Sequence, residues 1–148
     1  NYTEGINSRM DGLQAAILSV KLKYICEWTD IRIQHSAELS DLLSKIPHCA
    51  IPKICENVKH VFHLYVIRVN NRELLKKHLF ERGIESQIHY PKALPYIKAY
   101  EYLGHKPEDF PVSNIYQDKI LSLPMFPELD NHQIEYIVKT IKEYFIIN

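Results

Sequence analysis

Residues 5–18 read GINSRMDGLQAAIL, a polar turn that leads directly into an amphipathic helix. Asp11 and Gln14 have the spacing of a capping box, in which each side chain binds the backbone N–H of the other residue. The helix is therefore predicted to begin here, with Asn7 and Arg9 just ahead of its N-terminus. Backbone N–H groups and the helix dipole favour an anion at such a place, which makes Asn7 and Arg9 candidate anion-binding residues.

Apolar residues at helical spacing continue from Asp11 to Ile46, and Pro47 ends the pattern. This length indicates two helices, or one bent helix with its break near residues 22–24. The apolar stripe comprises Leu13, Ile17, Val20, Tyr24, Trp28, Ile31, Leu39, Leu42, Leu43 and Ile46. A helix with so long a stripe needs a large surface to lie on.

The remainder of the chain alternates short apolar runs with helical patterns. Strands are predicted over 48–54, 58–69, 84–90 and 121–123, and helices over 72–82, 111–120 and 130–145, with a helical turn near 96–103. Two further capping boxes are predicted, Asn70 with Glu73 and Asp130 with Gln133. The first strand is bounded by prolines and is predicted to lie at an edge, whereas the second is apolar on both faces and is predicted to be central. The pattern predicts an α+β fold in which a small, mainly antiparallel sheet packs against helices.

Composition narrows the class of protein. The 148 residues are 46% apolar, enough for one buried core, and 18 basic residues balance 18 acidic residues. This balance gives no electrostatic case for nucleic acid or an anionic membrane as a partner. Three cysteines without a repeating spacing favour reduced thiols, and no signal peptide or 18-residue apolar run is present. We therefore expect a cytoplasmic protein.

Three stretches of this sequence carry a family resemblance. Residues 5–16 fit the motif Gly-x-Asn-x-Arg-x-Asp-x-Leu-Gln-Ala-Ala, residues 89–91 read HYP, and residues 121–127 read LSLPMFP. Over nearly its whole length the chain resembles the C-terminal part of the DegT/DnrJ/EryC1/StrS sugar aminotransferases, pyridoxal 5'-phosphate enzymes of fold type I. The resemblance implies that residues 1–46 form an interdomain loop and long helix, and that residues 47–148 form the small C-terminal domain. It also implies a homodimer, and that the chain is a fragment without the large catalytic domain.

The resemblance assigns roles to four residues. It implies that Asn7, with Arg9 beside it, contacts the cofactor phosphate bound by the other subunit. Without the resemblance, Asn7 would be a turn residue and Arg9 a capping or surface residue. His89 and Tyr90 are implied to line the substrate side of the active site, although His89 taken alone would be a structural histidine. Pro95 stands where relatives often have a second histidine, which puts the sugar specificity in question.

No catalytic residue is expected in this chain. In the family, the lysine that forms a covalent bond with the cofactor lies earlier in the sequence than the loop that contains Asn7. Lys21 and Lys23 lie on the predicted helix and do not match it. The resemblance implies that the parent protein transfers an amino group, with glutamate as donor, to a nucleotide-linked keto sugar, and that this piece alone is inactive. Two alternatives stay open: a small-molecule-binding or regulatory domain that dimerises through its helix, and a family scaffold that has lost catalysis.

A metal site is not expected. His60 and His63 could be joined by Cys49 or Cys55, but residues three apart on a strand point to opposite faces of the sheet. The sequence also has no Cys-x-x-Cys motif. The stretch 121–127 is interpreted as a core strand and a rigid turn, without a chemical role.

Overall fold

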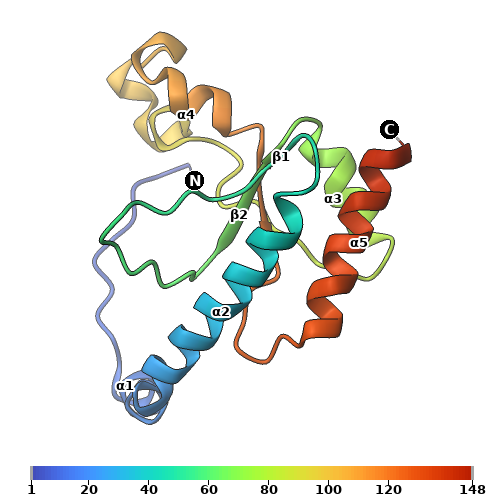
Figure 1. The fold of residues 1–148 in the computed structure, drawn as a ribbon. Coiled ribbons are helices and arrows are strands. Elements are labelled where there is room, and N and C mark those ends of the chain that lie inside the picture. Colours follow the sequence, from blue (N-terminus) through green and yellow to red (C-terminus); the bar gives the residue numbers. More distant parts are fainter. Residues whose placement is uncertain (1, 148) are drawn as a thin grey trace.

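The computed structural model describes residues 2–147, in which helices cover one face of a three-stranded antiparallel sheet (Figure 1). The α-helices are α1 (Gly12–Lys21), α2 (Ile25–Leu43), α3 (Arg72–Phe80), α4 (Pro111–Tyr116) and α5 (Asn131–Ile147). The strands are β1 (Cys49–Ala50), β2 (Tyr65–Val69) and β3 (Ile120–Leu123), and short 3-10 helices span Leu22–Tyr24, Leu94–Tyr96, Lys98–Leu103 and Pro107–Asp109. The predicted α+β class is confirmed.

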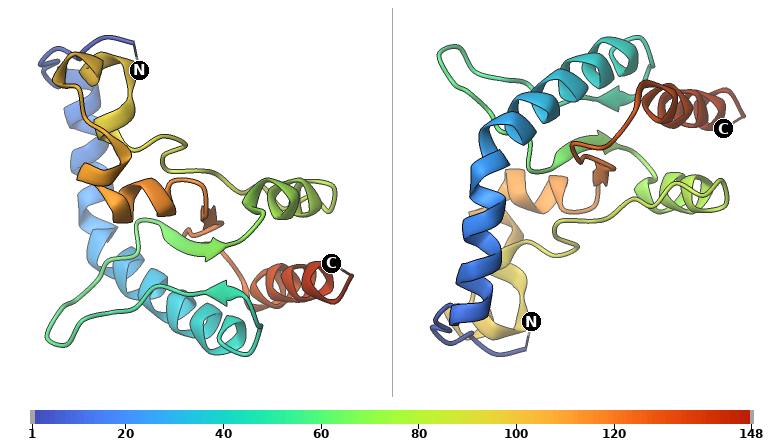
Figure 2. Two further views of the ribbon diagram at one scale, coloured as in Figure 1. Left: turned by 90° about the horizontal axis from the view of Figure 1, so that it is seen from above. Right: turned by 90° about the horizontal axis from the view of Figure 1, so that it is seen from below.

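The N-terminal helix begins and bends where the sequence predicts. Asp11 accepts a hydrogen bond from the backbone N–H of Gln14 at 2.8 Å, and the Gln14 side chain accepts one from the N–H of Asp11 at 3.2 Å. A 3-10 turn at Leu22–Tyr24 separates α1 from α2, so the predicted break is confirmed. Figure 2 shows α1 running away from the sheet while α2 lies along it.

The apolar stripe of this helix is buried over only part of its length. In α2, Leu39 and Leu43 are fully buried, and Ile46 just beyond the helix is buried as well. None of the α1 residues is buried, and Leu13 has an exposed fraction of 73%. Within residues 2–147, the face of α1 that carries the stripe therefore has no surface to lie on.

The sheet has the order β1-β2-β3, with both neighbouring pairs antiparallel. Strand β2 is central, as predicted, and aligns Tyr65 with Leu123 and Ile67 with Leu121. Alternate residues of β2 are buried against the helices, because successive side chains of a strand point to opposite faces. The Tyr65 hydroxyl forms a 2.8 Å hydrogen bond with Ser40 Oγ, which joins this strand to α2.

Helix α5 begins at the capping box predicted for Asp130 and Gln133, with reciprocal hydrogen bonds of 2.8 and 3.0 Å. Its buried face packs on α2 and α3 over the sheet. The buried residues of this core come from all three helices and all three strands, and include Leu39, Leu43, Cys49, Ile67, Leu75, Leu79, Leu121, Ile134 and Ile141.

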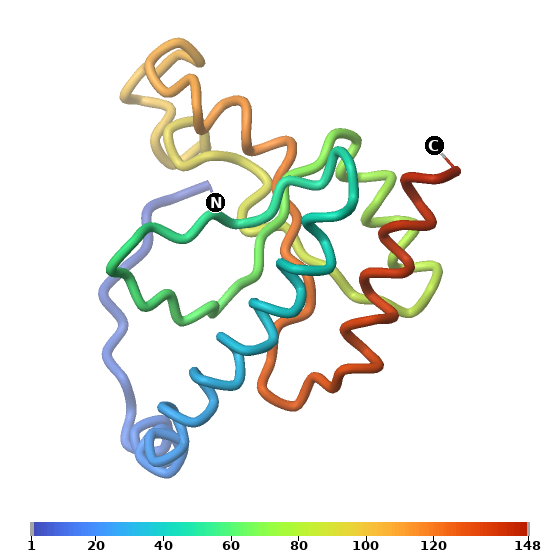
Figure 3. Tube along the Cα trace, in the orientation of Figure 1, coloured from blue at the N-terminus to red at the C-terminus, as the bar shows by residue number. Residues whose placement is uncertain are grey.

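Two predicted strands are much shorter in the structure. The strand predicted over 48–54 is reduced to Cys49–Ala50, although its edge position is correct. The strand predicted over 58–69 begins only at Tyr65, because Phe62 has a positive φ angle of 46°, which an extended strand cannot contain. Residues 51–64 instead form a loop that leaves the sheet, as Figure 3 shows.

Two other predictions for regular structure are wrong. Residues 84–90 form no strand, and their pairing is limited to one bridge between Gln87 and Ser122. The capping box predicted for Asn70 and Glu73 is absent, because Asn71 is the N-cap residue in a left-handed conformation and Glu73 pairs with Arg72. The helices predicted over 72–82 and 111–120 end earlier, at Phe80 and Tyr116.

Candidate functional site

The segment that contains Asn7 and Arg9 is extended and exposed. Two contacts fasten its start to the 3-10 helix at Lys98–Leu103. The Tyr102 hydroxyl donates a 3.1 Å hydrogen bond to Glu4 Oε1, which raises the pKa of Tyr102, and the Lys98 ammonium lies 5.5 Å from the ring centre of Tyr2. Segments almost 100 residues apart in sequence are thus held side by side.

The side chains of Asn7 and Arg9 are free to bind a ligand. Within residues 2–147, neither side chain makes a hydrogen bond or an ion pair, and both are exposed. Arg9 also borders a shallow hollow of about 540 Å³ against the first turns of α1. The helix end itself is less open to an anion than the sequence suggested, because the Asp11 carboxylate already occupies the cap. An anion here would therefore depend on the amide and guanidinium donors.

His89 and Tyr90 lie on the segment that follows the bridge to β3, and the peptide bond between them is cis. The His89 ring is half-buried, and its Nδ1 lies 2.9 Å from the hydroxyl oxygen of Ser122 in β3. Tyr90 is 71% exposed, and its ring stands edge-on to the His89 ring with 5.8 Å between ring centres. The strand thus fixes the histidine, whereas the tyrosine projects from the surface.

Tyr90 borders a pocket of about 570 Å³ whose lining also includes residues of α4 and the first residue of β3. Its wall is mainly apolar and includes Leu94, Ile97, Val112 and Ile120, with Lys92 and Gln117 as polar members. Gln117 closes this wall, because its Oε1 accepts a 2.9 Å hydrogen bond from the Ala93 backbone N–H. A pocket with an apolar wall and a few polar groups suits an organic ligand with polar substituents.

The two predicted pairs form separate surfaces in this structure. Among the described residues no hydrogen bond joins Asn7 or Arg9 to His89 or Tyr90, and Arg9 and Tyr90 border different pockets. The site roles of all four residues stay predictions. Sequence reasoning missed Ser122, which it placed in a core strand without chemistry. Ser122 is 33 residues from His89, and no spacing rule connects two residues across a loop of that length.

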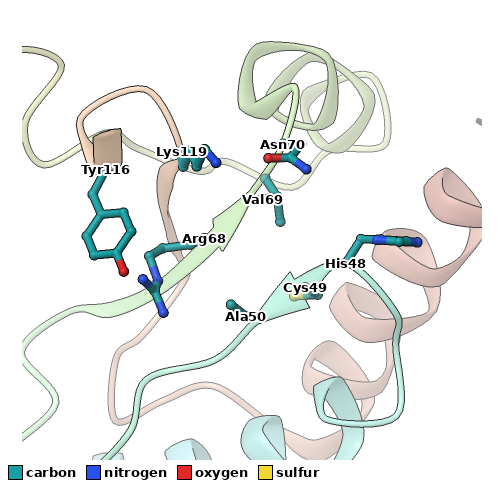
Figure 4. A pocket seen from close by; sticks show the side chains of 8 residues that line it. All are labelled: His48, Cys49, Ala50, Arg68, Val69, Asn70, Tyr116 and Lys119. Atoms are coloured by element: carbon teal, nitrogen blue, oxygen red, sulfur yellow. The ribbon is translucent and has the colours of Figure 1, made fainter. Parts of the chain in front are cut away.

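A second hollow, of about 390 Å³, lies beside the edge strand β1 (Figure 4). The Arg68 guanidinium is stacked over the Tyr116 ring at 4.2 Å from its centre, and Lys119 lies on the same rim. Cys49 lies in the wall, and its burial raises the pKa of the thiol to about 11. None of the four predicted site residues borders this hollow.

Of the two histidines considered for a metal, His60 contacts Phe62 in the loop before β2. The Phe62 backbone N–H donates a 3.1 Å hydrogen bond to His60 Nδ1, and the two rings are in contact. In residues 2–147, no group of three or more His, Cys, Asp or Glu side chains is placed to hold a metal ion. None of the helices within residues 2–147 has the length and apolar character needed to span a membrane.

Comparisons with known proteins agree with this architecture. The sequence model of the DegT/DnrJ/EryC1/StrS aminotransferase family matches residues 1–142. The chain is 39% identical over 147 residues to a protein of Geobacillus stearothermophilus described as a pleiotropic regulatory protein, covering 98% of this chain and 40% of that one. It is 35% identical to the dTDP-3-amino-3,6-dideoxy-alpha-D-galactopyranose transaminase of Aneurinibacillus thermoaerophilus, covering 97% and 39%.

A solved structure, the DegT DnrJ EryC1 StrS aminotransferase from Brucella abortus, superposes with a TM-score of 0.85 at 32% identity. The match covers 95% of this chain and 37% of that one. The chain thus spans about two fifths of the length of the relatives it matches. The match of the family model over residues 1–142, together with this shared architecture, places the chain in the DegT/DnrJ/EryC1/StrS aminotransferase family.

Proposed function

We propose that the chain is the small domain, with its connecting loop and helix, of a pyridoxal-phosphate-dependent aminotransferase. The parent enzyme transfers an amino group from glutamate to a nucleotide-linked keto sugar, and the 148 residues alone do not turn over. Family membership supports the reaction class, and the transaminase of Aneurinibacillus thermoaerophilus, named for a dTDP-linked amino sugar, supports the substrate class. The observation that carries the proposal is the pair of unpartnered donors, Asn7 and Arg9, in the motif ahead of α1.

The donor chemistry of this segment suits the cofactor's phosphate. A carboxamide N–H and a guanidinium give charge-assisted hydrogen bonds to phosphate oxygens, and neither group is used within residues 2–147. When bound, pyridoxal phosphate supplies the carbonyl group that takes up and releases the amino group. Asn7 and Arg9 hold its phosphate, and in the proposed homodimer they do so for the partner subunit.

The apolar face of α1 supports a larger assembly. Leu13, Ile17 and Val20 have exposed fractions of 73%, 52% and 59%, which makes an apolar surface along one helix. Surfaces of this kind mark contacts with another part of the protein or with a partner chain. We propose that the large domain and the second subunit cover this face in a cytoplasmic homodimer.

His89 and Tyr90 serve the sugar in this proposal. The half-buried imidazole is held by β3, and Tyr90 borders the pocket of about 570 Å³ whose wall combines apolar and polar groups. An imidazole nitrogen and a phenol hydroxyl can both hydrogen-bond to sugar hydroxyl or keto oxygens. Their role is to position the sugar, and the proton transfers belong to the family's lysine outside these residues.

The test separates the two pairs of residues in the full-length enzyme. Arg9→Gln is expected to weaken cofactor binding by about 10- to 100-fold, because one charge-assisted hydrogen bond to a phosphate is lost. Lys23→Gln, which removes an exposed cation from the 3-10 turn between α1 and α2, is the matched control and should leave cofactor affinity unchanged. His89→Asn should raise the KM for the sugar without altering cofactor affinity. Normal cofactor affinity in Arg9→Gln would refute the phosphate role.

A regulatory function is the second candidate, favoured by the 39% identity to a protein described as a pleiotropic regulatory protein. It predicts a full-length protein that binds no pyridoxal phosphate and gives no transfer of nitrogen to a sugar. Equilibrium dialysis with the cofactor distinguishes the two functions, because only the aminotransferase needs to retain it.

A further inference from the structure

The buried serine of β3 is fixed more firmly than the histidine that it contacts. The backbone of Ser122 pairs with Gln87 in both directions, with the N–H of Gln87 donating at 3.0 Å and that of Ser122 donating at 2.8 Å. On its other side Ser122 aligns with Val66 of the central strand. Ser122 is 3% exposed, so its hydroxyl is held in one place and has little access to water.

The number of available hydrogen-bond partners indicates which atom donates the hydrogen bond between Ser122 and His89. Within residues 2–147, His89 Nδ1 is the only hydrogen-bond partner of the Ser122 hydroxyl, at 2.9 Å. If the ring donated its proton to Ser122 Oγ, the hydroxyl hydrogen would be buried without an acceptor, at a cost in free energy. The hydroxyl therefore donates, Nδ1 accepts, and the neutral ring carries its proton on Nε2.

We propose that Ser122 is a positioning residue that holds His89 as the Nε2–H tautomer, so that His89 offers an N–H donor to an oxygen of the bound sugar. This inference rests on the proposed function, in which His89 contacts the substrate. Nε2 has no hydrogen-bond partner among the described residues, and the ring is half-buried. The Tyr90 ring stands edge-on to the imidazole with 5.8 Å between ring centres, and the hydrogen bond with Ser122 sets which nitrogen carries the proton before the sugar binds.

The chain offers a matched control for the serine. Ser86 is also buried, with 4% exposure, and its Oγ has no hydrogen-bond partner within residues 2–147. Ser86→Ala removes a buried hydroxyl that has no hydrogen-bond partner among the described residues, whereas Ser122→Ala removes the hydroxyl that donates to His89. Ser122→Thr keeps the hydroxyl and is the rescue variant.

The first readout is the nitrogen NMR spectrum of full-length protein labelled with ¹⁵N-histidine, recorded without substrate. His89→Asn identifies the His89 signals by their loss. We expect a protonated Nε2 and a bare Nδ1 in the wild type, in Ser86→Ala and in Ser122→Thr, and a mixture of tautomers in Ser122→Ala. A proton on Nδ1 in the wild type, or an unchanged tautomer in Ser122→Ala, overturns the inference and leaves the proposed function intact.

The second readout is steady-state kinetics with the nucleotide-linked keto sugar. Ser122→Ala should lower kcat/KM for the sugar by about two- to tenfold, the value of one neutral hydrogen bond, with unchanged cofactor affinity. Ser86→Ala and Ser122→Thr should stay near the wild type. If the tautomer is as expected but neither Ser122→Ala nor His89→Asn changes the sugar kinetics, His89 does not contact the sugar, and the donor role falls with that part of the proposed function.

Discussion

Replacing Arg72 by methionine tests how the pocket wall is supported. Arg72 begins α3, yet its side chain is only 8% exposed and reaches the segment ahead of β3. Its Nη1 donates to the backbone carbonyl of Gln117 and lies 3.5 Å from that of Ile120, while Nε and Nη2 bind the Glu73 carboxylate at 3.1 and 3.0 Å. One buried cation thus joins a helix to the segment that borders the Tyr90 pocket.

The magnitude follows from the burial of each partner. A hydrogen bond from a charged donor to a carbonyl contributes about 1.5–3 kcal/mol, and the carbonyl of half-buried Gln117, left without this partner, adds to the loss. The 3.5 Å contact with Ile120 contributes little. We therefore expect Arg72→Met to lower the free energy of unfolding by about 2–4 kcal/mol. Glu73 is 69% exposed, so Glu73→Gln should cost at most about 1 kcal/mol.

Urea unfolding of the two variants beside the wild type measures this difference. With a slope of about 2 kcal/mol/M, Arg72→Met should shift the midpoint by about 1–2 M, and Glu73→Gln by less than about 0.5 M. Equal losses in the two variants would show that the ion pair, rather than the buried carbonyl contacts, accounts for the stability. A loss below about 1 kcal/mol in Arg72→Met would refute the reasoning about burial.

Three further predictions concern groups outside the proposed site. Cys49 should resist a thiol-specific reagent at neutral pH until the protein unfolds, while exposed Cys26 reacts at once, which mass spectrometry of the labelled peptides would show. Asp11→Ala should cost about 1 kcal/mol in urea unfolding through the lost cap, and Asp11→Asn should restore most of it; equal losses would count against the cap. Burial raises the pKa of Tyr65 from 10.0 to about 12, so the folded state keeps a proton that the unfolded state releases. Its contribution to the free energy of unfolding is complete below pH 10 and is lost as the pH rises toward 12. A plot of the free energy of unfolding against pH should therefore be flatter for Tyr65→Phe than for the wild type over that range, and identical slopes would contradict this.

Features decided by neighbouring residues could be predicted from the sequence. The capping box of Asp11 and Gln14 and the break at residues 22–24 depend on contacts within one or two helical turns. The central position of the strand ending at Val69 was also predictable, because its residues are apolar except for Arg68, with alternate ones buried and those between them half-buried.

Features decided by distant residues could not be predicted. The apolar run over 58–64 resembles a strand, but the positive φ of Phe62 and the bond from the Arg32 Nε–H to the Val61 carbonyl at 3.4 Å hold it as a loop against α2. Residues 84–90 alternate as a strand would, yet Gln87 is the only one of them that pairs with β3, and the His89 side chain forms a hydrogen bond with the Ser122 hydroxyl. Such long-range pairings leave no local pattern in the sequence.

The most direct test of the aminotransferase proposal follows the nitrogen atom. Full-length protein is incubated with pyridoxal phosphate, ¹⁵N-glutamate and a nucleotide-linked keto sugar, and the nucleotide sugar is then analysed by mass spectrometry. The proposal predicts an amino sugar that carries the ¹⁵N label, formed by the wild type and much more slowly by Arg9→Gln at limiting cofactor. An unlabelled keto sugar recovered from a protein that retains no cofactor would contradict it.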